Sequence, residues 1–227
     1  HVAGHDQEKV RQASEIISRQ VSHMTSLVDD LLDVSRVSRG QVRLDRTPIA
    51  VEALLHEATE QVRPLIESCQ HRLDTRLPPE PLYAFGDRKR LVQVLANLLN
   101  NAAKYTPPGG NLAVEVAAGE DAVTIVVRDN GVGIEPQLLP HVFELFTQAS
   151  RAIDRSQGGL GIGLSLVKGI AELHGGSVSA HSAGSGSGSE FILTLPRHSA
   201  PVSSPIAREE SARATSRLAE PLRILIV

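Results

Sequence analysis

The sequence is poor in several residue types, and each shortage argues against a class of protein. Aromatic residues make up only 3% of the 227 residues and Trp is absent, so nucleic-acid bases would find few side chains to stack on. The 23 Lys and Arg residues are outnumbered by 26 Asp and Glu residues, the net charge is −3, and no basic stripe is visible. We therefore expect no nucleic-acid partner.

Cysteine and long apolar runs are also scarce. Cys69 is the only cysteine, which excludes an internal disulfide and a cysteine-based zinc site. No apolar run reaches the roughly 18 residues of a membrane-spanning helix, so we expect no membrane segment in this chain and a cytoplasmic location. Because the chain starts without Met and stops on the apolar run LRILIV, we expect a fragment of a longer protein, which could be membrane-anchored upstream.

The N-terminal part predicts one long helix with an apolar seam. A stretch from about residue 6 to residue 39 contains neither Gly nor Pro, and a helix of this length would extend roughly 50 Å. Its seam needs a partner helix in a bundle or a dimer, and the alternative is a long helix lying on a globular core. The seam consists of Ile17, Val21, Met24, Val28 and Leu31.

Downstream of this helix, strand and helix patterns alternate. We expect strands at 47–50 and 71–77, a helix at 51–69, two strands around the turn at 118–121, one or two short helices at 134–146, and a helix at 164–174. A hairpin at 177–196 closes this region, and its segment GSGSGS is interpreted as a plain flexible turn.

A helix capped by Asp87 carries the segment QVLANLLNNAAKYT at 93–106. On a helical wheel its polar residues form one stripe of amides and cations without a carboxylate, opposite an apolar face. Such a stripe suits a polyanion and its metal, although a merely solvated helix face is the alternative. The stripe consists of Arg90, Gln93, Asn97, Asn100, Asn101 and Lys104.

Two glycine-containing segments follow. In VTIVVRDNGVGIEP, a carboxylate and two glycines follow a strand, which permits close approach of a ligand but is also typical of a two-residue hairpin. In GGLGIGLSLVKGIAELHGG, glycines open directly into a helix, where free backbone N–H groups can face phosphate; a flexible hinge is the alternative. The second segment fits neither a P-loop nor a dinucleotide-binding fingerprint.

The order of these segments resembles one known family. NLLNNAAKYT, DNGVGI, the two phenylalanines of HVFELF, and GGLGIGLSLVK resemble the N, G1, F and G2 boxes of sensor histidine kinases. The segment LVDDLLDVSRVSRGQVRL resembles the end of the second helix of that family's dimerisation and phosphotransfer hairpin. The resemblance covers about residues 10–197.

The resemblance implies an α+β fold: a Bergerat-type two-layer α/β sandwich, with a mixed sheet covered by helices, preceded by a long helix. Residues 1–46 would hold the second hairpin helix and 47–197 the ATP-binding catalytic domain. Residues 198–221 would form a linker, and 222–227 the first strand of a truncated receiver domain. The implied partners are a second copy of the chain, through the helical hairpin, and a receiver domain in cis or in a response regulator.

ATP and Mg²⁺ are the implied cofactors. By the resemblance, Asn101 coordinates magnesium, Asn97 supports the metal and phosphates, Lys104 contacts phosphate, and Tyr105 packs beside the nucleotide. Asn97 and Lys104 are the residues expected to take part in catalysis. Asp129 accepts a hydrogen bond from the adenine amine. The remaining nucleotide-binding residues implied are Gly131, Gly133, Ile134, Gly159, Gly161, Gly163 and Leu164.

A lid is expected at roughly 135–158, with Arg155 and Gln157 as candidates for contact with the γ-phosphate. Phe143 and Phe146 fit core packing at least as well as nucleotide contact. The family's phosphoacceptor motif is absent: His5 and His23 are weak candidates, and we expect the acceptor histidine on an upstream helix.

The implied activity is ATP-dependent transfer of the γ-phosphoryl group to that histidine, for relay to a receiver aspartate. One alternative is a nucleotide-binding regulatory or dimerisation module without phosphotransfer. The other is a different Bergerat-fold ATPase, which would use a glutamate on the asparagine-rich helix to activate water. That helix has no acid between Arg88 and Lys104.

Overall fold

The computed structural model describes residues 43–147 and 160–199, together with residues 10, 11, 14, 17, 18, 21, 24, 25, 28, 31–37 and 39 near the N-terminus. The described residues 10–37 are helical. Among the residues described, no helix combines the length and the apolar character needed to cross a membrane. Residues 200–221 of the linker expected at 198–221, the expected receiver strand at 222–227, His5 and His23 lie outside the described residues.

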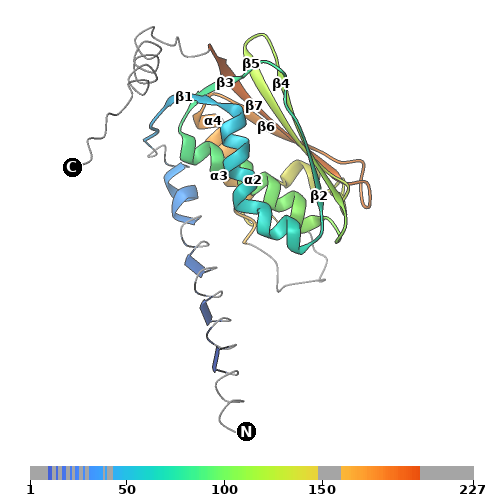
Figure 1. Cartoon of the computed structure of the whole chain (residues 1–227). Helices are drawn as coiled ribbons and strands as arrows, with labels where there is room; N and C mark the ends of the chain where they lie inside the picture. Colours follow the sequence, from blue (N-terminus) through green and yellow to red (C-terminus); the bar gives the residue numbers. More distant parts are fainter. Residues whose placement is uncertain are drawn as a thin grey trace, which may run out of the picture.

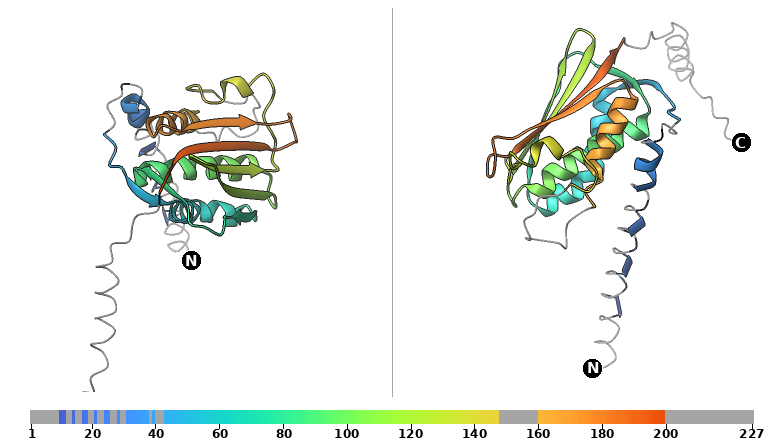
Figure 2. Two further views of the ribbon diagram at one scale, coloured as in Figure 1. Left: turned by 90° about the horizontal axis from the view of Figure 1, so that it is seen from above. Right: turned by 180° about the vertical axis from the view of Figure 1, so that it is seen from behind.

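One mixed sheet and three helices form the folded domain (Figures 1 and 2). The strands are β1 (Thr47–Ala50), β2 (Arg72–Arg76), β3 (Tyr83–Gly86), β4 (Asn111–Ala118), β5 (Ala122–Asp129), β6 (Ser177–His181) and β7 (Ser189–His198). Their order is β1-β3-β7-β5-β4-β2, and β6 pairs with β7. Among these described strands, only the β2–β4 pair is parallel.

The helices α2 (Val51–Ser68), α3 (Arg88–Tyr105) and α4 (Gly163–Leu173) cover one face of the sheet. Helix α3 lies between the other two, in contact with both. Its buried leucines face the inward-pointing residues of β4, β5 and β7, and burying one such side chain contributes about 1.5–3 kcal/mol. The fully buried leucines of α3 are Leu91, Leu95, Leu98 and Leu99.

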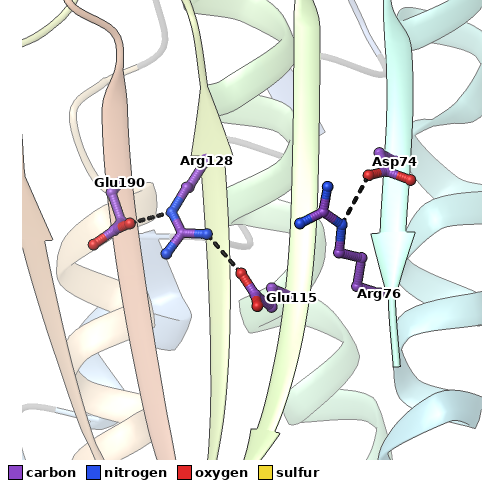
Figure 3. A network of polar contacts seen from close by, with 5 residues as sticks. All are labelled: Asp74, Arg76, Glu115, Arg128 and Glu190. Carbon is purple, nitrogen blue, oxygen red and sulfur yellow. Dashed lines mark hydrogen bonds and ion pairs between the residues drawn. The ribbon is translucent and has the colours of Figure 1, made fainter. Parts of the chain in front are cut away.

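The opposite face of the sheet is polar, as the strict alternation along β4 and β5 requires. Figure 3 shows Arg128 on β5 bridging Glu190 on β7 and Glu115 on β4, with 2.7 Å between Arg128 Nη1 and Glu115 Oε2. The hydrogen bonds that Arg128 donates to Glu190 and Glu115 raise the pKa of its guanidinium above the usual value. The sheet therefore has one face in the core and one face bearing charged pairs.

The structure differs from the expected elements in two places. Strand β3 has no counterpart in the sequence prediction, although its four residues join β1 to β7. The one or two helices expected at 134–146 were wrong in extent, since only Leu139–His141 form a short 3-10 helix. Pro136 and Pro140 lack the N–H groups that a longer α-helix would need there.

Candidate nucleotide-binding site

The C-terminal half of the α3 stripe is open to solvent. Asn97, Asn101 and Lys104 are half-buried, whereas Asn100 at the edge of the stripe is exposed, as expected of a solvated residue. Within the described part of the chain, neither the Asn97 nor the Asn101 side-chain amide makes a hydrogen bond. Two amides held on a rigid helix are thus free to bind a ligand.

The start of α4 lies beside this stripe. A Cβ added to Gly163 would stand 3.5 Å from the Oδ1 atom of Asn97, which is ordinary van der Waals contact. The first N–H groups of a helix have no partner inside the helix and form its positive end. The N-terminus of α4 and the amide of Asn97 therefore face the same space, which is suited to an anion.

Asp129 ends β5 with its carboxylate held by three donors. Its Oδ1 atom accepts hydrogen bonds from the backbone N–H groups of Gly131, at 2.8 Å, and Ser189, at 3.3 Å. Its Oδ2 atom accepts from the Ser189 hydroxyl. A carboxylate has about four acceptor positions, so one position on Oδ2 remains for a further donor.

The loop after Asp129 is fastened to the end of α3. Val132 N donates to the carbonyl oxygen of Tyr105 at 3.0 Å. A Cβ on Gly131 would lie 2.3 Å from that same oxygen, so only glycine permits this approach. This contact places the segment that follows Asp129 beside Tyr105, so the DNGVGI and NLLNNAAKYT segments lie next to each other.

Tyr105 is 47% exposed, and the Nζ atom of Lys104 lies 5.1 Å from the centre of its ring. Both side chains thus stand at the open edge of the site. Ile134 and Leu164, which were expected to bind nucleotide, are partly buried against the hydrophobic core. Their packing fixes the backbone on either side of the site.

The segment GSGSGS forms the turn between β6 and β7, as expected, and this loop also packs against the Asp129 segment. Gly186 N donates to Val132 O at 2.7 Å, and Gly188 N donates to Gly131 O at 3.1 Å. Gly133 has φ +71, and a Cβ there would lie 2.1 Å from Gly184 O. The glycines serve close backbone packing, which composition alone could not distinguish from flexibility.

The described residues on either side of 148–159 meet at the base of the expected lid. Phe146 N donates to Gly161 O at 3.1 Å, and a Cβ on Gly161 would lie 2.8 Å from Thr147 O. Phe143 packs edge-on against Phe191 with ring centroids 6.5 Å apart, whereas Phe146 is 63% exposed. Gly159, Arg155 and Gln157 lie outside the described residues.

The comparisons with known proteins decide the family. Residues 86–199, about half of the chain, match the model of the histidine kinase-, DNA gyrase B- and HSP90-like ATPases. The chain belongs to this ATPase family. Its sheet and helices accordingly form the Bergerat fold predicted from the sequence, and the matched region is an ATP-binding domain of the histidine kinase kind.

Similar proteins are named as histidine kinases. The circadian input-output histidine kinase CikA of Thermosynechococcus vestitus is 33% identical over 87% of this chain and 27% of its own length. The hybrid signal transduction histidine kinase D of Dictyostelium discoideum is 34% identical over 82% of this chain and 12% of its own length. The chain thus spans less than a third of either relative.

Solved structures agree with this assignment. The full-length structure of ShkA in complex with AMPPNP has a TM-score of 0.72 to this chain, with 27% identity over 85% of this chain and 40% of that one. A mycobacterial sensor histidine kinase, MprB, has a TM-score of 0.59 with 28% identity, over 68% of this chain and 99% of that one.

The N-terminal half of the α3 stripe in this ATPase domain has a different partner. Arg90 forms an ion pair with Asp33 of the N-terminal helix, and Gln93 Nε2 donates to Asp33 at 3.2 Å. A Cβ on Gly169 of α4 would lie 2.3 Å from Val37 Cγ1, so a glycine allows this helix to lie against α4. Sequence reasoning did not identify Asp33, because its partner lies 57 residues away in the chain.

Proposed function

We propose that the chain is the ATP-binding catalytic core of a sensor histidine kinase, which transfers the γ-phosphoryl group of ATP to a histidine. One observation carries the proposal: the Asn97 amide of α3 lies beside the N-terminus of α4, while the Asp129 loop is fastened to the end of α3. An adenine group and a phosphate group therefore each have a suitable place at one edge of the domain.

Asp129 would recognise the adenine end. The free acceptor position on its Oδ2 atom can take a hydrogen bond from the exocyclic amine, and the three donors already present hold the carboxylate in place. Gly131 and Gly133 leave the adjoining backbone without side chains. Tyr105 offers an exposed ring at the same edge.

Lys104, Gly161 and Gly163 would hold the phosphates, Lys104 as a point charge and the glycines through backbone N–H groups near α4. Gly159, Arg155 and Gln157 remain predictions for the same end. Phosphoryl transfer needs positioning and charge neutralisation more than covalent chemistry by the protein, which fits a site of amides and cations.

The donor set suits magnesium held jointly with a nucleotide. Among the described residues, no group of three or more His, Cys, Asp or Glu side chains could hold a metal ion by itself. Asn101, assisted by Asn97, provides one or two amide oxygens, and Mg²⁺ is commonly bound by few protein ligands plus substrate phosphates. Bound there, the metal would neutralise phosphate charge.

Helix α3 also argues for a kinase over a water-activating ATPase. The sequence of α3 contains no Asp or Glu that could serve as a general base for water. Hydrolysis by this chain is expected to be slow. The phosphoacceptor histidine is proposed to lie on an upstream helix.

The N-terminal helix is proposed to pair with a second copy of the chain. Its described seam residues are all exposed, at 62% for Ile17, 56% for Val21, 64% for Met24 and 56% for Val28. Such a continuous apolar seam is typical of a helix that packs against others in a bundle. A receiver domain that begins at 222–227 is proposed as the relay partner, an arrangement supported by the hybrid kinase among the relatives.

Asn101→Ala tests the proposal. We expect ATP affinity in the presence of Mg²⁺, measured by titration calorimetry, to fall by about tenfold or more, because a metal-held triphosphate loses its amide ligand. Circular dichroism should show an unchanged fold, since the Asn101 amide has no described partner to lose.

Asn100→Ala is the matched control. Asn100 is an exposed asparagine on the same helix. The ATP affinity of the Asn100→Ala variant should lie within about twofold of that of the original protein, as expected of a surface substitution. Equal affinity of the Asn101→Ala and Asn100→Ala proteins would contradict the metal role.

A further inference from the structure

We propose that Ser182 is a positioning residue that sets the preference for adenine, by locking the β6–β7 loop to the segment that carries Asp129. The inference rests on the proposed ATP binding and extends it to a residue outside the matching motifs. The loop lies at the end of the sheet where β5 finishes, since Asp129 and Ser189 are partners in the β5–β7 ladder (Figure 1).

The Ser182 hydroxyl uses its full bonding capacity. It donates to Gly188 O at 2.7 Å and accepts from Ile134 N at 2.9 Å and from Gly184 N at 3.3 Å. A hydroxyl has one donor and two acceptor positions, so all three are occupied. One half-buried side chain thereby joins three backbone segments.

Two of these segments border the adenine end of the site. Ile134 directly follows Gly133, and Gly188 directly precedes Ser189, whose N–H and hydroxyl hold the Asp129 carboxylate. A shift of Gly188 would therefore move both Ser189 donors. The free position on Asp129 Oδ2 would then no longer point in a fixed direction toward an incoming amine.

Close packing makes this arrangement sensitive to small changes. A Cβ on Gly188 would lie 2.0 Å from the carbonyl oxygen of Asp129, and one on Gly133 would lie 2.1 Å from Gly184 O. The backbone of the loop and that of the Asp129 segment are thus in direct contact. Ser182 supplies the only described side-chain hydrogen bond between residues 182–188 and residue 134.

The test compares ATP with inosine triphosphate, which lacks the exocyclic amine, for the original protein and the Ser182→Ala variant. Charged hydrogen bonds commonly change affinity by about tenfold or more. We expect Ser182→Ala to weaken ATP binding by roughly five- to tenfold and binding of inosine triphosphate by less than about twofold. The preference for ATP should therefore shrink, and Ser182→Thr, which keeps a hydroxyl, should restore it.

Ser185→Ala is the matched control, because Ser185 is an exposed serine of the same loop, and it should keep the original preference. Amide hydrogen exchange without nucleotide provides a second readout: the Ile134 N–H should exchange faster in Ser182→Ala than in Ser185→Ala. Equal loss of affinity for both nucleotides, an unchanged preference, or unchanged exchange at Ile134 would overturn the inference. Failure of the original protein to bind ATP would instead refute the proposed function, and the exchange measurement would still decide the role of Ser182 in holding the loop.

Discussion

The ion pair between Asp33 and Arg90 predicts a measurable link between the N-terminal helix and the ATPase domain. The side chains are only 14% and 25% exposed, respectively, and Gln93 adds a second donor to the carboxylate. Burial alone would raise the pKa of Asp33, but the hydrogen bonds from Arg90 and Gln93 and the charges of Arg90 and Arg36 together hold it below its usual value. The pair therefore stabilises the ionised form.

The expected magnitude lies between two known limits. Exposed pairs contribute roughly 0.2–1 kcal/mol, whereas removing one partner of a fully buried pair costs about 3–5 kcal/mol. Because both side chains keep some solvent contact, we expect Asp33→Asn or Arg90→Met to lower the free energy of unfolding by about 1.5–2.5 kcal/mol. That loss corresponds to a fall in Tm of roughly 3–10 °C for a domain of this size.

A double-mutant cycle would measure the coupling directly. Urea unfolding of the original protein, both single variants and the double variant should give a coupling free energy of about 1–2 kcal/mol. The exposed pair Arg76–Asp74, with side chains 73% and 54% exposed, is the control and should give less than about 0.5 kcal/mol. Equal coupling in the two cycles would show that the helix does not dock on α3 in solution. Because the folded pKa of Asp33 is lowered, its contribution should be present above about pH 4 and lost as pH falls further.

Two further predictions concern pH and phosphotransfer. His174 is buried; its Nε2 atom accepts a hydrogen bond from Asp87 N at 3.0 Å, and its Nδ1 atom contacts Ile170 O. This burial lowers the pKa of His174 below its usual value of 6.5. Its contribution to stability should be complete above pH 6.5 and fall by at most about 1.4 kcal/mol per pH unit below it. Urea midpoints at pH 7.5 and 5.5 should show this slope in the original protein, and a smaller slope in His174→Gln; equal slopes would exclude His174 as the cause. A longer protein that includes the proposed upstream helix should form an acid-labile phosphohistidine from labelled ATP. The absence of phosphohistidine would favour a nucleotide-binding module without phosphotransfer.

Much of the domain could be predicted because local signals are strong there. Asp87 caps α3 by accepting from Arg90 N at 3.2 Å, as its position before the apolar pattern indicated. Helix α4 begins at Gly163, one residue before the predicted start. The hairpin of β4 and β5 follows from its period-two pattern and the short turn between its strands.

The parts that could not be predicted depend on contacts between distant residues. Strand β3 is four residues long and owes its existence to pairing with β1 and with the last two residues of β7. The parallel pairing of β2 with β4 carries no local signal in the sequence. The packing of Gly184 and Gly188 depends on the Asp129 segment, more than fifty residues upstream.

The polar stripe on α3 shows how one local pattern can serve two neighbours. Its amides and cations without a carboxylate suggested a single anionic ligand. In the structure the stripe has two parts, and the boundary lies between Gln93, which contacts Asp33, and Asn97, which lies beside α4 about one helical turn further on. Toward the N-terminus, Arg90 and Gln93 meet the carboxylate of Asp33. Toward the C-terminus, the proposed ligand is a triphosphate. Because both neighbours are anionic, an acid in the stripe would be repelled either by Asp33 or by the proposed triphosphate, and this repulsion accounts for a stripe without Asp or Glu.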